Sequence, residues 1–108
     1  MAIIVTGDDP ALPVTLKKSK AVFAIAPTAT VQASVVSVDK LTTLIPPITC
    51  DNAATGADWA NSLVMVEFTS AQTAAISATG EALLEIQVDD GGKLTWFVLI
   101  TIETGTIA

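Results

Sequence analysis

The sequence predicts an all-β protein, an antiparallel β-sandwich of about eight strands with one short helix near residues 70–76. Three observations lead to this prediction. Apolar and polar residues alternate with a period of two in most segments, turn residues recur at short intervals, and a helix start signal occurs once. A small β-barrel is the second possibility. Residues 1–108 are expected to form a single β-sandwich domain.

A β-hairpin over residues 81–102 is the clearest element of the pattern. Alternate residues are apolar from Ala82 to Val88, and a second extended run covers residues 94–102. Asp90 and Gly91 lie between the two runs. An Asp-Gly pair flanked by β-forming residues is a strong hairpin signal, because Gly accepts the positive φ of a tight turn. Other strands are therefore expected to cover the apolar faces of this hairpin.

Shorter extended segments precede the hairpin. They are expected at residues 3–5, 14–16, 22–25, 31–38, 41–45 and 63–68. Pro46-Pro47 is expected to end the segment at 41–45. The three lysines Lys17, Lys18 and Lys20 are interpreted as a solvated hairpin tip, with an anionic docking patch as the alternative. The polar segment 49–61 is expected to be a surface loop, in which Trp59 either covers one end of the core or serves as a binding hot spot.

The single helix is predicted from a capping box. Thr69 and Gln72 have the Thr-x-x-Gln spacing in which a hydroxyl and an amide satisfy the free N–H groups of a first helical turn. The helix is expected at Ser70–Ile76, with Gly80 placed just beyond its end as a C-cap glycine.

The composition excludes several kinds of partner and of chemistry. The net charge is −6 and the chain has no Arg, so a nucleic-acid partner is not expected. The longest apolar run, residues 96–100, is far shorter than the roughly 20 residues that span a bilayer, so no membrane partner is expected either. The N-terminus does not resemble a secretory signal, so the chain is expected to fold where it is made. The single Cys50 is interpreted as a small buried residue, with a reactive thiol as the alternative.

The absence of His and Tyr argues against an enzyme. Without His there is no Ser-His-Asp or Cys-His arrangement and no imidazole ligand for zinc. Glu81 and Glu85 share a strand face and could divide acid and base roles, but an outward polar face explains them more simply. The loop aspartates lack the Asp-x-Asp-x-Asp spacing of a calcium loop. The protein is therefore expected to be non-enzymatic, with no metal and no cofactor.

The order of the segments resembles a known family. An N-terminal strand with Thr-Gly-Asp-Asp and "LPVTL" precedes "ATVQASVV", a small-residue loop and "VEFTSAQTAAIS", and Gly80, a strand, an Asp-Gly turn and a closing strand follow. This order is similar to that of the small immunoglobulin-like β-sandwich modules of tailed-bacteriophage virions, including the N-terminal domain of upper baseplate proteins. The resemblance spans nearly the whole chain.

The resemblance implies a structural protein of a phage virion, assembled in the host cytoplasm, that docks in multiple copies on the capsid as a decoration or cement subunit. A tail, baseplate or fibre attachment adaptor and a carbohydrate- or host-surface-binding module are the alternatives. The expected partners are phage structural proteins (capsid or tail) and further copies of the chain. The candidate protein–protein contacts are Ile3, Ile4, Val5, Trp59, Phe97 and Leu99.

Overall fold

The computed structural model describes residues 2–18, 21–22, 24–76 and 79–104. Its strands are β1 (Ala2–Val5), β2 (Ala11–Thr15), β3 (Lys17–Lys18), β4 (Ala21–Val22), β5 (Thr30–Val36), β6 (Thr43–Cys50), β7 (Leu63–Glu67), β8 (Gly80–Asp89) and β9 (Lys93–Glu103). Its helices are α1 (Ser70–Ala74) and the 3-10 helix η1 (Trp59–Asn61). The predicted all-β sandwich with one short α-helix is confirmed.

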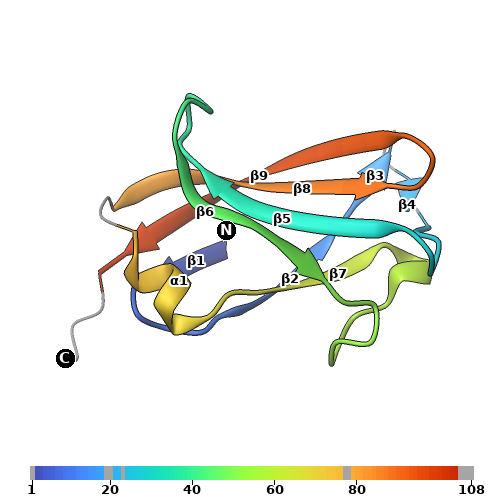
Figure 1. Ribbon diagram of the computed structural model, residues 1–108, viewed down its shortest axis with the longest axis horizontal. Helices are drawn as coiled ribbons and strands as arrows, with labels where there is room; N and C mark the ends of the chain where they lie inside the picture. Colours follow the sequence, from blue (N-terminus) through green and yellow to red (C-terminus); the bar gives the residue numbers. More distant parts are fainter. Residues whose placement is uncertain (1, 19–20, 23, 77–78, 105–108) are drawn as a thin grey trace.

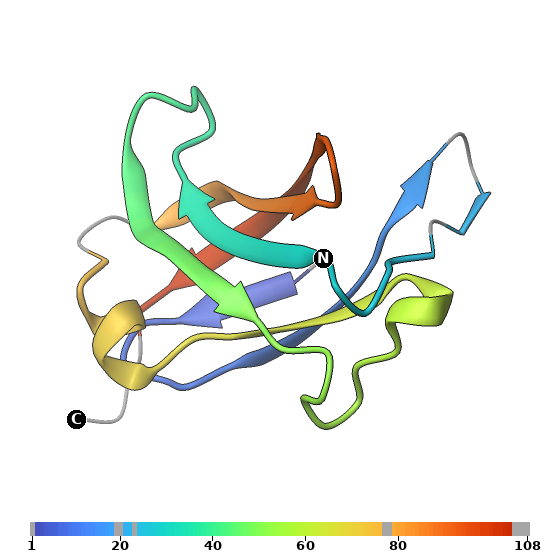
Figure 2. The same cartoon turned by 45° about the vertical axis from the view of Figure 1, so that its right-hand side comes forward.

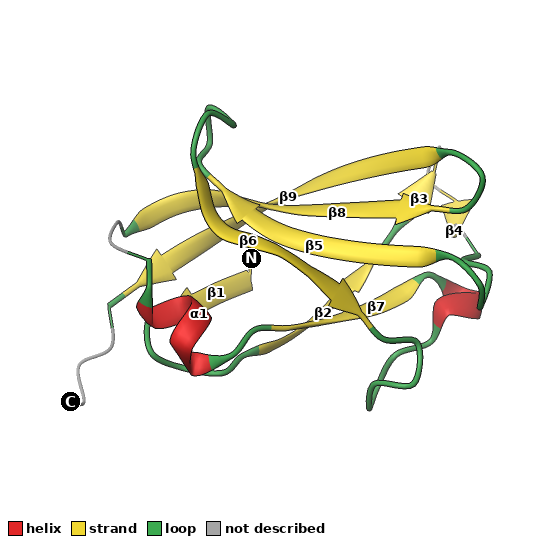
Figure 3. Ribbon diagram, viewed as in Figure 1, coloured by secondary structure: helices red, strands yellow, loops and turns green. Residues whose placement is uncertain are grey.

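Two layers of strands make up the sandwich. Five strands form one sheet in the order β1-β9-β8-β5-β6, and β2 pairs with β7 in the second layer. Figure 1 shows β2 and β7 along one side of the five-stranded sheet, and Figure 3 shows how little of the chain is helical. The pair β3 and β4 extends from one end of the molecule as a small separate ribbon, which is clear in Figure 2. No helix among the described residues is both long and apolar enough to cross a membrane.

The predicted hairpin is confirmed as β8 and β9. Ten residue pairs join the two strands, from Gly80 opposite Ile102 to Asp89 opposite Lys93. Gly91 has a φ of +76° in the turn, as the Asp-Gly signal predicted.

The alternation along β8 decides which side of the sheet is buried. Its even-numbered residues, from Ala82 to Val88, are at most 2% exposed and pack in one core cluster with Val64 and Val66 of β7. The odd-numbered residues of β8 point to the opposite side because side chains alternate along a strand. One side of the five-stranded sheet therefore forms the core, and the other side is turned away from β2 and β7.

Two strand predictions were wrong in detail. The first strand pairs with β9 in parallel, whereas the other strand pairs are antiparallel, as predicted. The prolines at 46 and 47 do not end a strand, because β6 runs through both. They lie in a bulge between Ile45 and Ile48, opposite Ser34 of β5, and β6 is an edge strand of the sheet. Prolines are tolerated at bulges and edges since no ladder hydrogen bond is lost there.

The capping box is confirmed, and the helix is shorter than predicted. Thr69 Oγ1 accepts a hydrogen bond from Gln72 N at 3.2 Å, and Gln72 Oε1 accepts one from Thr69 N at 2.7 Å. The helix ends at Ala74, and Gly80 is the first residue of β8, so it is not a C-cap. Thr73 of α1 is fully buried and joins the helix to the turn after β1: its Oγ1 accepts from Gly7 N at 3.0 Å and donates to Asp8 O at 2.5 Å.

Candidate functional site

The side of the five-stranded sheet turned away from β2 and β7, here called the outer face, carries an exposed apolar row. Phe97 and Leu99 on β9 are 41% and 39% exposed, and Ile3 on β1 is 49% exposed. Leu99 lies opposite Leu83 of β8, which in turn lies opposite Val36 of β5. The exposed part of the row lies on β9 and β1, and half-buried Leu83 and buried Val36 continue it across β8 and β5.

Hydrogen bonds within the loop between β5 and β6, which lies beside this row, fix its conformation. Ser37 N donates to Thr42 O at 2.8 Å, and Thr42 N donates to Ser37 Oγ at 3.1 Å. The Asp39 carboxylate accepts hydrogen bonds from the Ser37 hydroxyl and from Leu41 N, and these bonds lower the pKa of Asp39. The loop is thus closed by its own hydrogen bonds, although its residues are largely exposed.

This loop places a cation over the aromatic ring of the outer face. Lys40 has a φ of +65°, and its Nζ lies 4.0 Å from the centroid of the Phe97 ring. Val38 and Leu41, which are 53% and 86% exposed, flank Lys40 in the same loop. Six large apolar residues are exposed in the described part of the chain. All but Leu94 lie on the outer face or in this loop.

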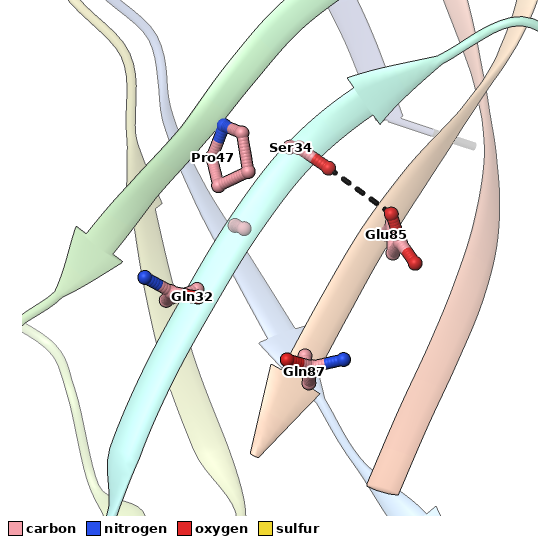
Figure 4. Close-up of a pocket in the computed structure, with 6 residues that line it drawn as sticks. Gln32, Ser34, Pro47, Glu85 and Gln87 are labelled. Carbon is pink, nitrogen blue, oxygen red and sulfur yellow. Dashed lines mark hydrogen bonds between the residues drawn. The ribbon is translucent and has the colours of Figure 1, made fainter. Parts of the chain in front are cut away.

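The other half of the outer face is polar and contains a small hollow. The hollow has a volume of about 110 Å³ and is lined by Gln32, Ala33, Ser34, Pro47, Glu85 and Gln87. Figure 4 shows the labelled side chains on three adjacent strands, β5, β6 and β8. Ser34 is 3% exposed and donates to Glu85 Oε1 at 3.3 Å. Glu85 lies opposite Phe97 in the β8–β9 register, so the hollow adjoins the apolar row.

The candidate contact residues divide into surface and core residues. Phe97, Leu99 and Ile3 are exposed on the outer face, and Val5 is half-buried. Ile4 is fully buried and Trp59 is 7% exposed, so neither offers a contact surface. Ile4 faces inward because it neighbours outward-facing Ile3 on a strand. Trp59 packs in the core cluster, which is the first of the two roles considered for it.

The reactive and charged groups do not assemble a recognisable reaction centre in the described part of the chain. Burial, reinforced by the negative charge of Glu67, raises the pKa of the Cys50 thiol to about 11. A thiol in that state is a poor nucleophile at neutral pH. Glu81 and Glu85 do lie on one strand face as expected, but Glu85 is bound by Ser34 and Glu81 lies outside the hollow.

Sequence reasoning missed the hollow and the Lys40 contact. Gln32 and Ser34 lie far along the chain from Glu85 and Gln87, and only the pairing of β5 with β8 brings them together. Lys40, which contacts Phe97, lies in a loop 57 residues earlier in the sequence. The one signal available was the alternation that put Gln32, Ser34, Glu85 and Gln87 on the outward sides of their strands.

Comparison with known proteins identifies the fold. The chain matches no protein-family model and none of the curated proteins. Its structure is similar to the crystal structure of CopC from Methylosinus trichosporium OB3b, with a TM-score of 0.53 and 9% sequence identity, over 100% of this chain and 90% of that chain. The protein thus has a CopC-like β-sandwich of the immunoglobulin-like or cupredoxin-like kind, with one short helix.

This finding corrects the resemblance to phage virion modules, which was wrong. The expectations built on it are corrected too: the capsid decoration or cement role, the tail, baseplate or fibre adaptor, the carbohydrate- or host-surface-binding module, the virion location, and the phage and self-association partners. The resemblance rested on the order of the segments, and its most specific parts were the capping-box segment followed by Gly80 and the Asp-Gly turn. Such signals specify local structure in any β-sandwich, so they do not identify a family.

Proposed function

We propose that the protein is a non-enzymatic binding module that docks another protein on its outer face. A CopC-like fold is typical of non-enzymatic binding proteins, which supports the first part of this proposal. The observation that carries the second part is the concentration of exposed apolar side chains on one face. Three of these side chains, Phe97, Leu99 and Ile3, lie on strands of the sheet. Val38 and Leu41 are exposed in the adjacent loop, whose Lys40 contacts Phe97.

The geometry of this face suits a protein partner. Binding hot spots are enriched in aromatic side chains that are surrounded by contacts excluding water. Phe97 has this setting, since Leu99 is two residues away on the same side of β9 and Lys40 covers part of its ring. Exposed apolar groups gathered on one surface mark interaction sites more often than scattered ones do.

Copper binding of the kind associated with CopC does not fit the residues of this chain. Imidazole, thiolate and thioether groups are common copper ligands in proteins, and the chain has no His and two Met, Met1 and Met65. Met65 is half-buried on β7, and Met1 lies outside the described residues. The one Cys is buried with a pKa of about 11, so the thiolate ligand is disfavoured. No group of three or more His, Cys, Asp or Glu within the described ranges could hold a metal ion. The similarity in fold therefore does not extend to this ligand.

Site-specific photo-crosslinking tests the proposed binding face. A photoreactive phenylalanine analogue would replace Phe97 or Leu99 in cells that naturally make the protein. We expect both positions to give one and the same crosslinked protein, identified by peptide mass spectrometry. With that protein purified, Leu99→Asp should weaken binding at least tenfold, because a charge would be buried in an apolar contact.

Leu94 provides the matched control, since it is exposed on the same strand but on the inward-facing row of residues. The analogue at position 94 should give no such crosslink, and Leu94→Asp should leave the affinity unchanged. Equal crosslinking from positions 94, 97 and 99, or none from 97 and 99, would contradict a dedicated outer-face site.

A further inference from the structure

We infer that the anchoring residue of the partner is an arginine, whose guanidinium group binds at Glu85 in the polar hollow while its aliphatic stem lies against the apolar row. This inference rests on the proposed function and specifies the chemistry of the partner. It follows from the juxtaposition of a carboxylate, two amide groups and an aromatic ring on three neighbouring strands.

The hollow contains hydrogen-bond acceptors that accept few hydrogen bonds from the described residues. Ser34 occupies Glu85 Oε1, and no donor from the described residues lies on Glu85 Oε2. Gln87 donates through Nε2 to Thr95 Oγ1 at 3.5 Å, and Figure 4 shows its amide oxygen turned toward β5. Gln32 lies directly opposite Gln87 across the β5–β8 pair. A carboxylate and two amide oxygens match the five N–H donors of a guanidinium group, which has no acceptor of its own.

The apolar side of the hollow suits the stem and the plane of an arginine. Residues directly opposite in an antiparallel pair have Cβ atoms roughly 5 Å apart, so the Phe97 ring adjoins Glu85. Arginine stacks on aromatic faces and pairs with carboxylates in a fork that lysine cannot reproduce. The contact of Lys40 with Phe97 indicates that this ring already attracts a cation from within the chain.

Charge favours a cationic partner that is not a second copy of this chain. The protein carries a net charge of −6, and three acidic residues, Glu81, Glu85 and Asp89, lie on the outward side of β8, with Lys93 opposite Asp89 and Lys40 over the Phe97 ring. Complementary charge steers such a partner to this face and suppresses acidic ones. The chain contains no arginine, so a second copy could not provide the anchor.

Nuclear magnetic resonance with a single arginine probe tests this assignment. N-acetyl-arginine amide would be titrated into the ¹⁵N-labelled protein while the side-chain amide signals of its glutamines are followed. We expect saturable shifts for Gln32 and Gln87 and none for Gln72, which is fixed in the capping box. Glu85→Gln keeps the shape of the side chain and should weaken binding about tenfold, as expected for loss of a charge-assisted bond.

The controls separate the guanidinium site from general charge. Glu81 lies on the same side of β8 as Glu85 but outside the hollow. Glu81→Gln should change the affinity for the arginine probe by no more than about twofold, because an exposed charge contributes little. Lys40→Ala should tighten binding, since it frees the Phe97 ring. Equal shifts with N-acetyl-citrulline amide or N-acetyl-lysine amide, or an unchanged affinity in Glu85→Gln, would overturn the assignment.

The outcome is distinguishable from failure of the proposed function. Crosslinks from Phe97 and Leu99 without any response of Gln32 and Gln87 to the arginine probe would leave an apolar docking face and overturn the arginine anchor. A specific response to the probe without crosslinks would support the cation site and contradict the protein-docking surface.

Discussion

The two faces of the five-stranded sheet differ in burial although their residues alternate along the same strands. On β8, Leu84 and Ile86 are fully buried against the second layer, whereas Leu83 and Glu85, which alternate with them along the strand, face outward. On β9 the outward row includes Phe97 and Leu99, which are as apolar as core residues yet about 40% exposed. Apolar residues are therefore covered by the second layer on the inner face, and on the outer face some of them remain exposed to solvent.

The largest expected effect comes from truncating one leucine on each face. Leu84→Ala should lower the free energy of unfolding by about 2–5 kcal/mol, because it leaves a cavity in a closely packed core. Leu99→Ala should lower it by less than about 1 kcal/mol, since Leu99 is 39% exposed. Urea unfolding followed by circular dichroism measures both. Similar losses in the two variants would mean that the outer face is also part of the stabilising core.

A buried hydroxyl extends the comparison to polar groups. Thr73→Val keeps the side-chain shape but removes the acceptor of Gly7 N and the donor to Asp8 O. We expect a loss of about 1–3 kcal/mol, the penalty for leaving buried polar groups unpaired. Thr49→Val, at an exposed position on β6, should change stability by less than about 0.5 kcal/mol. If the Thr73 variant unfolded at the wild-type urea midpoint, the link between α1 and the turn after β1 would be unimportant.

Substitutions in the β8–β9 turn test the effect of backbone conformation on stability without any change in side-chain packing. A Cβ at Gly91 would meet no atom within 4 Å, but the φ of +76° disfavours any L side chain. Gly91→Val should therefore cost about 1–2 kcal/mol through the backbone alone. Gly92→Val, in equally open space without the left-handed φ, is the matched control and should cost less. Equal melting temperatures for the two variants would contradict this explanation of the hairpin.

The smallest effect at neutral pH concerns the buried thiol of Cys50. Its pKa is raised to about 11 from an ordinary value of 9.0. Above pH 9 the unfolded chain loses this proton while the folded chain keeps it, so stability should fall between pH 9 and pH 11 and be unaffected below. Unfolding of wild type and Cys50→Ala across this range measures the difference. If the free energies of unfolding of wild type and Cys50→Ala differed by the same amount from pH 7 to pH 11, the buried state of the thiol would be contradicted.

Two local signals in the sequence were reliable, whereas the predicted C-cap at Gly80 was wrong because Gly80 begins β8. The Asp90-Gly91 turn and the Thr69–Gln72 capping box formed as predicted, because their hydrogen bonds and dihedral angles involve residues close in the chain. The prolines of β6 were misread because a proline interrupts a central strand but is tolerated in the bulge of an edge strand. Whether a strand lies at the edge of a sheet depends on its pairing with strands distant in sequence.

The site was only partly predictable. Phe97, Leu99 and Ile3 were chosen as contacts and are exposed, whereas Ile4 and Trp59, chosen with them, are buried. An apolar residue looks the same in a sequence whether a second layer covers it or not. The binding role of Phe97 and Leu99 remains a prediction for the crosslinking experiment.

The sequence by itself determined the strand periodicity, the tight turn, the helix start and the all-β class, because each depends on bonds and dihedral angles within a few residues. Only the tertiary structure decided which face of the sheet is covered, which residues of β5 and β8 meet in the hollow, and where Lys40 lies relative to Phe97. The reason is that contacts between distant strands depend on how whole layers pack, and no local pattern encodes that arrangement.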